Sequence, residues 1–372
     1  MDLLEKFRGC MLGVAVGDGL GRPFEGSCPV DPNMVEETAE NAAMLYYTDD
    51  TEMTLNLAKS LVERGELDLR HVSKSFASNF NPMRGYGPNT LYILQRIKEG
   101  EEWRQLAEKS MGGEGSFGNG AAMRVAPLAL LFRGEEMIQA VRECSRVTHT
   151  HPAGIEGAVL QATGIHLALH SEPGSFNPPQ FLEELGAVLT SEIFREKLER
   201  VKKLLLEPPL QSKIIQELGN GIEAFNSVPT ALYCFLSSSS FREGVLKAVS
   251  LGGDADTIGS MTGALLGALL GAKAIPSKWA TKIEGREEIE NLASKLFFLF
   301  VKRELEECEF CLGQEELEVV KIDPCGEMCL ENLMLICKHC RKELAKGVRL
   351  APKKKRGKYR AVYRRSYRRG ID

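Results

Sequence analysis

The sequence predicts an all-α protein with a small cysteine-rich and basic appendage at its carboxyl-terminal end. Apolar residues recur at helical spacing through the first 300 residues, and no alternating strand pattern of any length interrupts them. Cysteines cluster and basic residues accumulate beyond residue 302. We therefore expect a helical body over 1–302, a Cys-rich segment over 303–350 and a disordered basic tail over 351–372.

The composition is that of an ordinary soluble globular protein, with 372 residues of which 43% are hydrophobic and 26% charged. The first residues lack the basic start and apolar run of a signal peptide. The longest uncharged stretch, Ile258 to Ala272, is too short to span a bilayer. Four scattered cysteines fit reduced core thiols: Cys10, Cys28, Cys144 and Cys234. We expect an intracellular protein of the cytoplasm and nucleus without membrane contact.

The chain opens with a short amphipathic helix whose apolar face runs from Phe7 to Val14. The glycine-rich stretch 13–26 follows, but no strand precedes it and it lacks the spacing of a nucleotide-binding loop. Its glycines are expected to let helices approach closely. Glu25, on an irregular segment within this stretch, either faces a pocket or is an ordinary solvated loop acid.

Two acidic turns stand before helical segments. The first is Tyr47-Thr48-Asp49-Asp50-Thr51, followed by apolar residues at helical spacing. The second is Gly252-Gly253-Asp254-Ala255-Asp256-Thr257, which opens the apolar stretch Ile258 to Ala272. Taken singly, each turn is typical of a helix N-cap, because threonine and aspartate accept hydrogen bonds from the first free amides. Two copies in one chain favour a shared function.

The second turn needs a special backbone if its two acids are to act together. On a regular helix Asp254 and Asp256 would point about 200° apart, and Gly252 and Gly253 permit the non-helical turn that would bring them together. If both acidic turns meet in one pocket, protons or cations must neutralise their four carboxylates. Oxygen ligands suit Mg²⁺ or Ca²⁺, and two divalent ions would nearly cancel the four charges.

A glycine-rich loop over 112–120 carries five glycines in nine residues and leads into a helix that holds Met123 to Leu128. Backbone amides of such a loop at a helix N-terminus bind phosphate. The embedded Phe117 and Asn119 favour phosphate binding over a flexible linker.

Further helices are expected at 90–98 and after His149-Thr150-His151-Pro152, and a helical region is expected over 181–206. The segment 228–236 leads into a helix before Asp254. His166 and His170 stand four apart, as zinc ligands on a helix do, but the glutamate of that motif is missing. Core or surface histidines are therefore favoured there. Loops are predicted at 171–179 and 207–209.

Four motifs resemble the ADP-ribosylglycohydrolase family in their order and spacing: Tyr47 to Thr51, Gly115 to Val125, Thr148-His149 and Gly252 to Ile258. The segments 218–222 and 227–235 are most similar to the eukaryotic branch of this family that hydrolyses serine-linked ADP-ribose and poly(ADP-ribose). The resemblance covers about residues 5–300, and residues 303–372 have no recognised counterpart.

The resemblance implies an all-α helical bundle around a binuclear Mg²⁺ centre. The implied metal ligands are Glu25, Thr48, Asp49, Asp50, Asp254, Asp256 and Thr257. Glu25 is also the implied catalytic residue, because the family places there an acid that serves in acid/base catalysis. The implied substrate-binding residues are Asp49, Gly115, Ser116, Phe117, Gly118, Asn119, Gly120, His149 and Ile222. Phe117 stands where relatives can carry tyrosine, so a hydroxyl contact with the ligand would be lost.

The implied activity is Mg²⁺-dependent hydrolysis of the O-glycosidic bond between ADP-ribose and protein serine, with poly(ADP-ribose) as a further substrate and a place in the DNA damage response. The implied partners are ADP-ribosylated proteins and ADP-ribose, bound by a monomer. Hydrolysis of arginine-linked ADP-ribose and a non-catalytic ADP-ribose-binding module are the alternatives, and the intact acidic residues argue against the second. The sequence leaves the preferred linkage, and mono- versus poly(ADP-ribose), open.

The appendage carries two cysteine pairs with the spacing of zinc ligands, Cys308-x-x-Cys311 and Cys337-x-x-Cys340. The 25 residues between the pairs exceed the usual separation. A structural zinc ribbon and a poorly ordered extension with reactive thiols both remain open. Alternative zinc ligands are Cys325, Cys329 and His339.

The basic tail holds ten Lys or Arg residues and no acid between Lys353 and Arg369, with tyrosines among them. It is interpreted as a nuclear localisation signal, as a segment that contacts polyanions such as nucleic acid or poly(ADP-ribose), or as a solvated, disordered chain. Since the whole chain carries a net charge of −4, the body in front of the tail is strongly acidic.

Overall fold

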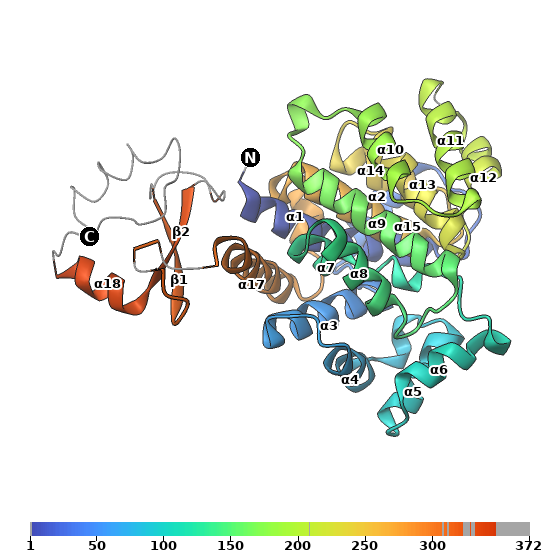
Figure 1. Ribbon diagram of the computed structural model, residues 1–372. Coiled ribbons are helices and arrows are strands. Elements are labelled where there is room, and N and C mark those ends of the chain that lie inside the picture. The colour runs from blue at the N-terminus through green and yellow to red at the C-terminus, as the bar shows by residue number, and fades with distance from the viewer. Residues whose placement is uncertain are drawn as a thin grey trace. The chain divides into compact units, whose positions relative to one another are not determined.

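The computed structural model describes residues 2–207, 209–306, 309–310, 312–322, 328 and 332–346 (Figure 1). The chain forms two compact units, one of residues 5–296 and one of residues 1–4 with 297–372. The first unit holds both acidic turns and the glycine-rich loop. The cysteine-rich segment belongs to the second.

The body is helical, which confirms the all-α prediction. Its α-helices are α1 (Leu3–Gly21), α2 (Pro32–Asn41), α3 (Asp49–Arg64), α4 (Leu69–Asn79), α5 (Pro88–Lys98), α6 (Trp103–Lys109), α7 (Ala126–Leu131), α8 (Gly134–Ser145), α9 (Pro152–His170), α10 (Pro178–Ala187), α11 (Glu192–Leu206), α12 (Gln211–Leu218), α13 (Ala224–Leu236), α14 (Phe241–Ser250), α15 (Ala255–Leu270), α16 (Ser277–Ala280) and α17 (Arg286–Leu305). Among the described residues of this unit, the only β-pairing consists of two single bridges, Leu45 with Ile283 and Gly118 with Glu223.

Helix α15 lies at the centre of the body. Every residue from Ala255 to Leu269 is buried, and α9, α13 and α14 pack against it (Figure 1). A helix that is apolar on all sides is stable only when other elements surround it. The apolar stretch after the second acidic turn therefore forms the buried helix that was predicted, and the turn itself is carried into the interior.

Helix α1 packs against α15 through glycines. A Cβ atom on Gly13 would overlap the carbonyl of Gly263, and one on Gly17 would overlap that of Gly259. These contacts recur every four residues, so the glycines share one face of α1. The expected close approach of helices is confirmed, because no side chain separates the two backbones.

The prediction of a short amphipathic opening helix is wrong in extent. Helix α1 continues to Gly21 and is buried on all sides from Gly9 onward. Glycine lowers helix propensity. Here each glycine of the contact face allows direct backbone packing against α15, which offsets that cost, so the helix runs through the glycine-rich stretch.

One predicted helical region is confirmed as two helices, and one predicted helix begins later than expected. The region 181–206 forms two helices, because Thr190 N and Ser191 N donate hydrogen bonds to the Glu156 carboxylate and so hold a turn between α10 and α11. The helix after the glycine-rich loop begins only at Ala126. Residues Asn119–Ala121 form a single 3₁₀ turn instead, and Pro127 occupies the first turn of α7, where proline is favoured.

The second unit contains the two strands of the described chain. Strands β1 (Leu317–Lys321) and β2 (Leu333–Cys337) pair antiparallel, with Val319 opposite Leu335, and α18 (Lys338–Ala345) follows β2. Strand β2 is buried along its whole length, so its sequence shows no alternation of apolar and polar residues. A small apolar core forms from Phe310, Ile322, Met334, Ile336, Cys337 and Cys340.

The basic tail 351–372 lies outside the described residues. Within the described ranges, none of the helices combines the length and apolar character needed to cross a membrane.

Candidate metal and ligand site

The second acidic turn has the backbone that its sequence predicts. Gly252 and Gly253 adopt left-handed φ values of +65° and +63°, which favour glycine. A Cβ atom on Gly253 would also overlap the carbonyl of Asn220. This turn leaves Asp254 at the N-cap of α15 and Asp256 in its first turn, both buried.

The first acidic turn begins α3. Thr48 is the N-cap residue, and its Oγ1 accepts a hydrogen bond from Asp50 N at 3.4 Å. Asp49 and Asp50 occupy the first helical turn and are buried. The acids therefore lie at a helix N-terminus, as predicted, but with their carboxylates withdrawn from water.

The two turns meet. Thr257 Oγ1 donates to Asp50 Oδ2 at 3.2 Å, and Thr48 Oγ1 donates to the same oxygen at 3.3 Å. The other oxygen, Asp50 Oδ1, is buried and has no hydrogen-bond partner among the described residues. A buried acceptor without a donor costs free energy, and a cation placed against it would remove that cost.

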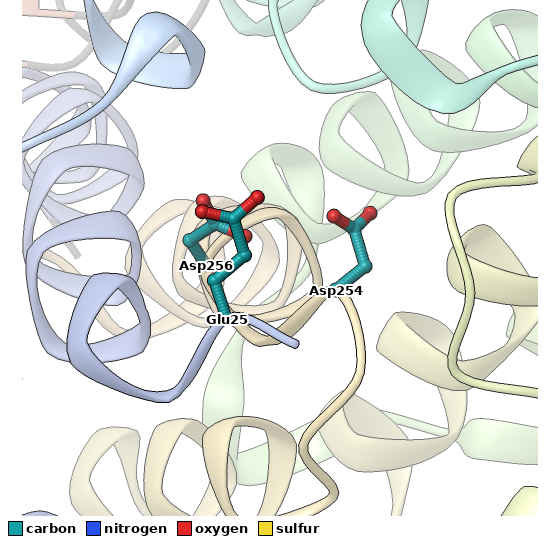
Figure 2. Close-up of side chains that lie close together, drawn as sticks. All are labelled: Glu25, Asp254 and Asp256. Carbon is teal, nitrogen blue, oxygen red and sulfur yellow. The ribbon is translucent and has the colours of Figure 1, made fainter. Parts of the chain in front are cut away.

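Glu25 joins the acids of the second turn. Oxygens of Glu25, Asp254 and Asp256 lie within 4.8 Å of one another, and in the described chain this is the one group of three or more potential metal ligands found (Figure 2). Two backbone hydrogen bonds hold the Glu25 segment there, from Gly26 N to Gly253 O at 2.7 Å and from Gly253 N to Ser27 O at 3.0 Å. Glu25 thus lies at the acidic cluster and is itself exposed.

The electrostatics of this cluster are unfavourable without a counter-charge. Burial, together with the charges of neighbouring carboxylates, raises the pKa of Asp49, Asp50 and Asp256 well above the usual range. Burial also raises the pKa of Asp18 and of Asp254 to about 6, although hydrogen bonds partly oppose it. Protons or cations are therefore needed to stabilise so many acids in one place.

Asp18 was missed by the sequence analysis. It lies on α1 and is fully buried, and its carboxylate accepts hydrogen bonds from Thr48 N at 2.9 and 3.0 Å, from Thr51 N at 3.1 Å and from Thr51 Oγ1 at 2.6 Å. The signal was present, since an acid stands alone in a run of small and apolar residues. Asp18 lies between Gly17 and Gly19, and the glycines alone were interpreted.

The glycine-rich loop reaches the acidic cluster through Asn119. Its side-chain amide donates to Asp254 Oδ2 and to Ser227 Oγ, the latter at 2.9 Å. The backbone of the loop pairs with residues before α13, since Asn119 N donates to Ile222 O at 2.9 Å and Ala224 N donates to Phe117 O at 3.1 Å. The predicted ligand residues 115–120 and Ile222 are thereby brought together beside the carboxylates.

The loop conformation differs from the expected loop followed by a helix. Because an α-helix begins only at Ala126, no α-helix N-terminus directly follows the loop. Gly115 has φ +76°, and a Cβ atom there would overlap the Thr150 side chain. Gly118 N donates to Ser116 Oγ at 3.2 Å. These contacts hold the loop close to the start of α9.

His149 supports the loop from beneath. It is buried, and a Cβ atom on Gly120 would lie 2.8 Å from its ring. Its Nδ1 lies 2.7 Å from Thr148 Oγ1. Burial and the nearby charge of Arg124 lower the pKa of His149 to about 3, so the ring is neutral at physiological pH.

Two apolar side chains remain open to solvent near this loop. Ile222 is 64% exposed, and Phe117 is partly exposed between His151 and Phe225, with ring-centroid distances of 5.7 and 6.2 Å. An exposed aromatic ring beside polar loop atoms is suited to stacking on a base or sugar.

Of the predicted zinc ligands, Cys308 and Cys311 lie outside the described residues, as do Cys325 and Cys329. Cys337 and Cys340 are buried at the junction of β2 and α18, where Cys340 N donates to Cys337 Sγ at 3.4 Å. The two histidines on α9, His166 and His170, contact each other edge to face at 4.6 Å between ring centroids.

Comparison with known proteins identifies the family of the helical body. Residues 1–306 match the family model described as ADP-ribosylglycohydrolase. The chain is 33% identical to ADP-ribosylhydrolase ARH3 of Homo sapiens, over 80% of this chain and 94% of that protein. It is 34% identical to the protein of the same name from Danio rerio, over 80% of this chain and 91% of that protein.

Two more distant proteins are similar over the same extent. The chain is 26% identical to ADP-ribosylarginine hydrolase Tri1 of Serratia proteamaculans, over 80% of each. A solved structure of an "ADP-ribosylglycohydrolase-related protein complex" is similar with a TM-score of 0.64 and 27% identity, over 80% of this chain and 99% of that one. Because the family match spans the whole helical body and identity to two relatives exceeds 30%, this chain belongs to the ADP-ribosylglycohydrolase family of enzymes.

Proposed function

We propose that this enzyme is a Mg²⁺-dependent ADP-ribosylhydrolase that cleaves the O-glycosidic bond between ADP-ribose and a protein serine. The observation that carries the proposal is the meeting of the two acidic turns at one buried point, Asp50 Oδ2, 3.2 Å from Thr257 Oγ1. Asn119 joins the glycine-rich loop to Asp254 of the second acidic turn. A nucleotide sugar held by the loop would therefore have carboxylates beside it.

The residues of the site fit a hard divalent cation. All candidate ligands are carboxylate or hydroxyl oxygens, which Mg²⁺ prefers to nitrogen or sulfur. The buried Asp50 Oδ1 lacks a donor among the described residues. We propose Glu25, Thr48, Asp49, Asp50, Asp254, Asp256 and Thr257 as the ligands of two ions. Once bound, such ions offset the buried charge, bind ribose hydroxyls and polarise water.

Glu25 is proposed to move the protons. It is exposed at the acidic cluster, whereas Asp254 and Asp256 are buried, so its carboxylate can exchange protons with water. Cleavage of a glycosidic bond passes through an oxocarbenium-like state that needs an activated water and a protonated leaving group. Glu25 either accepts the proton of the attacking water or passes a proton through a water to the leaving serine oxygen.

The glycine-rich loop is proposed to bind the diphosphate and the distal ribose. Gly115 N, Gly118 N and Asn119 N already donate hydrogen bonds within the protein, so the anion is assigned to the other backbone N–H groups of the loop. Asn119 joins the loop to the carboxylates. Phe117 is proposed to pack on the adenosine side, and His149 and Ile222 to complete the cleft.

Serine linkage is supported by two segments beside the loop. Residues 218–222 and 227–235 are similar to the branch of the family that hydrolyses serine-linked ADP-ribose and poly(ADP-ribose), and both contribute at the site, through Ile222 O and Ser227 Oγ. Identity to the relative named as an arginine hydrolase is lower, at 26%. Arginine-linked ADP-ribose is therefore the alternative substrate.

A panel of serine-linked, arginine-linked and polymeric substrates, assayed with Mg²⁺ and with EDTA, tests the proposal. Release of ADP-ribose from the serine-linked peptide but not from the arginine-linked substrate, abolished by EDTA, is expected, with poly(ADP-ribose) as a further substrate. Release from the arginine-linked substrate would replace the serine assignment. Binding of ADP-ribose without turnover of any substrate would identify a non-catalytic binding module instead.

We also propose that the second unit holds a structural zinc ion. Cys337 and Cys340 show the amide-to-sulfur hydrogen bond and the buried position of a paired zinc ligand, and Cys308 and Cys311 supply the second pair in sequence. Full-length protein analysed by mass spectrometry for metals is expected to hold about one zinc per chain. Cys337→Ser should lose it. Cys28 is an exposed free thiol and not the core thiol that was predicted, so Cys28→Ser should retain the zinc.

For the basic tail 351–372 we propose contact with polyanions, and for the whole protein residence in cytoplasm and nucleus. Ten basic residues can neutralise several phosphates, so binding should weaken steeply with salt. Full-length protein is expected to bind poly(ADP-ribose) or DNA more tightly at low salt than a chain ending at residue 350. Equal, salt-insensitive binding of both would exclude a role for the tail.

A further inference from the structure

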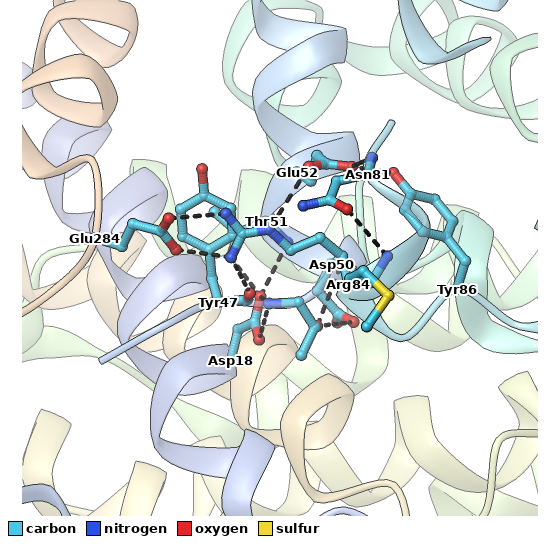
Figure 3. A network of polar contacts seen from close by, with 11 residues as sticks. Asp18, Tyr47, Asp50, Thr51, Glu52, Asn81, Arg84, Tyr86 and Glu284 are labelled. Carbon is cyan, nitrogen blue, oxygen red and sulfur yellow. Dashed lines mark hydrogen bonds and ion pairs between the residues drawn. The ribbon is translucent and has the colours of Figure 1, made fainter. Parts of the chain in front are cut away.

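A network of polar contacts lies behind the first acidic turn (Figure 3). Its centre is Arg84, at the end of the 3₁₀ turn Pro82–Arg84 between α4 and α5. The side chain is 16% exposed and is shared by three segments of the chain. None of these contacts involves a proposed metal ligand directly, and no role for Arg84 follows from the chemistry described above.

Arg84 is anchored by Glu284. The two side chains form a paired interaction, from Nη1 to Oε2 at 2.7 Å and from Nη2 to Oε1 at 2.8 Å. Two parallel charge-assisted hydrogen bonds fix the plane of the guanidinium. Arg84 also stacks over the Tyr47 ring, 4.3 Å from its centroid. Its orientation is therefore determined from two sides.

The anchored guanidinium reaches the backbone of the acidic turn. Arg84 Nη1 donates to Tyr47 O at 2.7 Å. The amide of the same peptide unit, Thr48 N, donates to the Asp18 carboxylate at 2.9 Å. Because a peptide unit is planar, a cation on its oxygen and an anion on its N–H together fix the orientation of the unit.

This peptide unit immediately precedes the proposed ligands. Thr48, Asp49 and Asp50 follow Tyr47 without an intervening residue, so a rotation of the Tyr47–Thr48 peptide would displace their side chains. We infer that Arg84 is a positioning residue: locked by Glu284 and held against Tyr47 O, it sets the acidic turn for binding of the divalent cation. The inference rests on the proposed function of the site.

The same segment is tied to α3, which prevents it from moving independently. Glu52, in the first turn of α3, accepts hydrogen bonds from Asn81 N at 2.7 Å and Tyr86 OH at 2.8 Å, and its carboxylate lies 3.7 Å from Arg84 Nε. The turn that carries Arg84 and the helix that carries Asp50 therefore form one polar assembly.

The test measures Mg²⁺ affinity by calorimetry, without substrate, beside thermal stability in EDTA. Arg84→Gln is expected to weaken Mg²⁺ binding about 10–100-fold, the usual result when a residue that orients ligands is removed. Arg84→Lys, which retains a donor for Tyr47 O, should restore part of the affinity. Glu284→Gln should fall between Arg84→Gln and the wild type.

Two controls separate positioning from a general loss of stability. Arg242→Gln removes an exposed arginine whose partner, Glu36, is on α2 away from the acidic turn, and Mg²⁺ affinity should be unchanged. Leu185→Ala removes a buried side chain of α10 and should lower the melting temperature without weakening Mg²⁺ binding. If Leu185→Ala and Arg84→Gln weakened Mg²⁺ binding equally at matched melting temperatures, Arg84 would be merely structural.

The outcome for Arg84 is distinguishable from the outcome for the function. A wild-type enzyme that binds Mg²⁺ and hydrolyses substrate, with an Arg84→Gln variant of unchanged Mg²⁺ affinity, would overturn the positioning role alone. A wild-type protein that binds no Mg²⁺ would overturn both.

Discussion

The side-chain amide of Asn119 donates a hydrogen bond to the Asp254 carboxylate, and so joins the glycine-rich loop to a proposed metal ligand. The same amide bonds to Ser227 Oγ at 2.9 Å, and Asn119 N bonds to Ile222 O. One residue therefore connects the proposed nucleotide-binding loop, α13 and the acidic cluster. A change of charge at Asp254 therefore alters the hydrogen bond that holds the loop, and a ligand bound to the loop alters the same hydrogen bond to Asp254.

Binding of Mg²⁺ and of ADP-ribose is therefore expected to be cooperative. Each should raise the affinity of the other by the same factor, because linkage between two binding equilibria is reciprocal. Asn119→Ala should reduce that factor toward one, as measured by calorimetric titration of each ligand with and without the other. Asn79→Ala, which removes an exposed amide on α4, serves as the control. Undiminished coupling in Asn119→Ala would show that the loop and the cluster communicate by another route.

Glu25→Gln should separate binding from turnover. The variant keeps the size and an oxygen of the side chain but cannot transfer a proton, so ADP-ribose affinity should change little while kcat falls about 10²–10⁴-fold. Product release from a serine-linked peptide and calorimetry with ADP-ribose measure the two quantities. Glu37→Gln, on the exposed side of α2, should leave both unchanged. Near-normal turnover of Glu25→Gln would refute the proton-transfer role.

Asp256→Asn should stabilise the metal-free protein and weaken its ligand binding. The Asp256 carboxylate is buried among like charges, which raises its pKa, so its neutral isostere relieves repulsion when no cation is present. The melting temperature in EDTA should rise, whereas the increase produced by Mg²⁺ and the affinity for ADP-ribose should both decrease. A lower melting temperature in EDTA would mean that this acid is already neutralised within the fold.

The stability of the metal-free protein should decrease as pH rises through about 6. The pKa of Asp18 and of Asp254 is raised to about 6 by burial, from about 3.9 in an unfolded chain. A group of this kind contributes its full stability below the unfolded pKa and loses it as pH rises through the folded pKa. The free energy of unfolding should therefore fall between about pH 4 and pH 7.

Mg²⁺ should reverse this loss most at high pH, because protons compete with the cation for the carboxylates. Thermal melts in EDTA and in Mg²⁺, at about pH 5 and about pH 7.5, measure the effect. A larger Mg²⁺-induced increase in melting temperature at the lower pH would contradict the direction of these pKa shifts.

Gly13→Ala should destabilise the body by about 1–3 kcal/mol, the usual cost of overpacking. The added methyl group would overlap the Gly263 carbonyl, which belongs to the backbone of α15 and cannot turn aside. Gly186→Ala is the matched control, since it lies on α10 with open space around its Cβ position, and it should be neutral or slightly stabilising. Denaturant unfolding measures both. Equal effects of the two substitutions would exclude the packing explanation.

The acidic turns were predictable because their signals are local. Gly252 and Gly253 permit the left-handed turn before Asp254, and Thr48 has the chemistry of an N-cap, so residue identity alone indicates both conformations. Their meeting across 207 positions, through Thr257 and Asp50, is a property of the fold. From the sequence one could infer only the consequence of such a meeting, namely that cations or protons would be needed to neutralise the carboxylates.

The misses share one physical cause, which is that contacts between distant segments overrode local patterns. Asp18 and Arg84 act on one peptide unit from α1 and from the segment before α5, and nothing in either local sequence indicates the other. Glu156 on α9 divides the predicted helical region 181–206 into two helices, because its carboxylate accepts hydrogen bonds from the backbone N–H groups of residues 190 and 191.

The glycine face of α1 also limits which parts of this enzyme can be removed. At the carboxyl-terminal end of α1, a Cβ atom on Gly21 would overlap Asp256 Cα. The second acidic turn therefore packs directly against the backbone of α1. A shortened protein lacking residues 1–21 would retain every carboxylate of both turns and leave one flank of α15 open to water. Mutational surveys confined to the chemically reactive side chains would overlook a helix that their function requires.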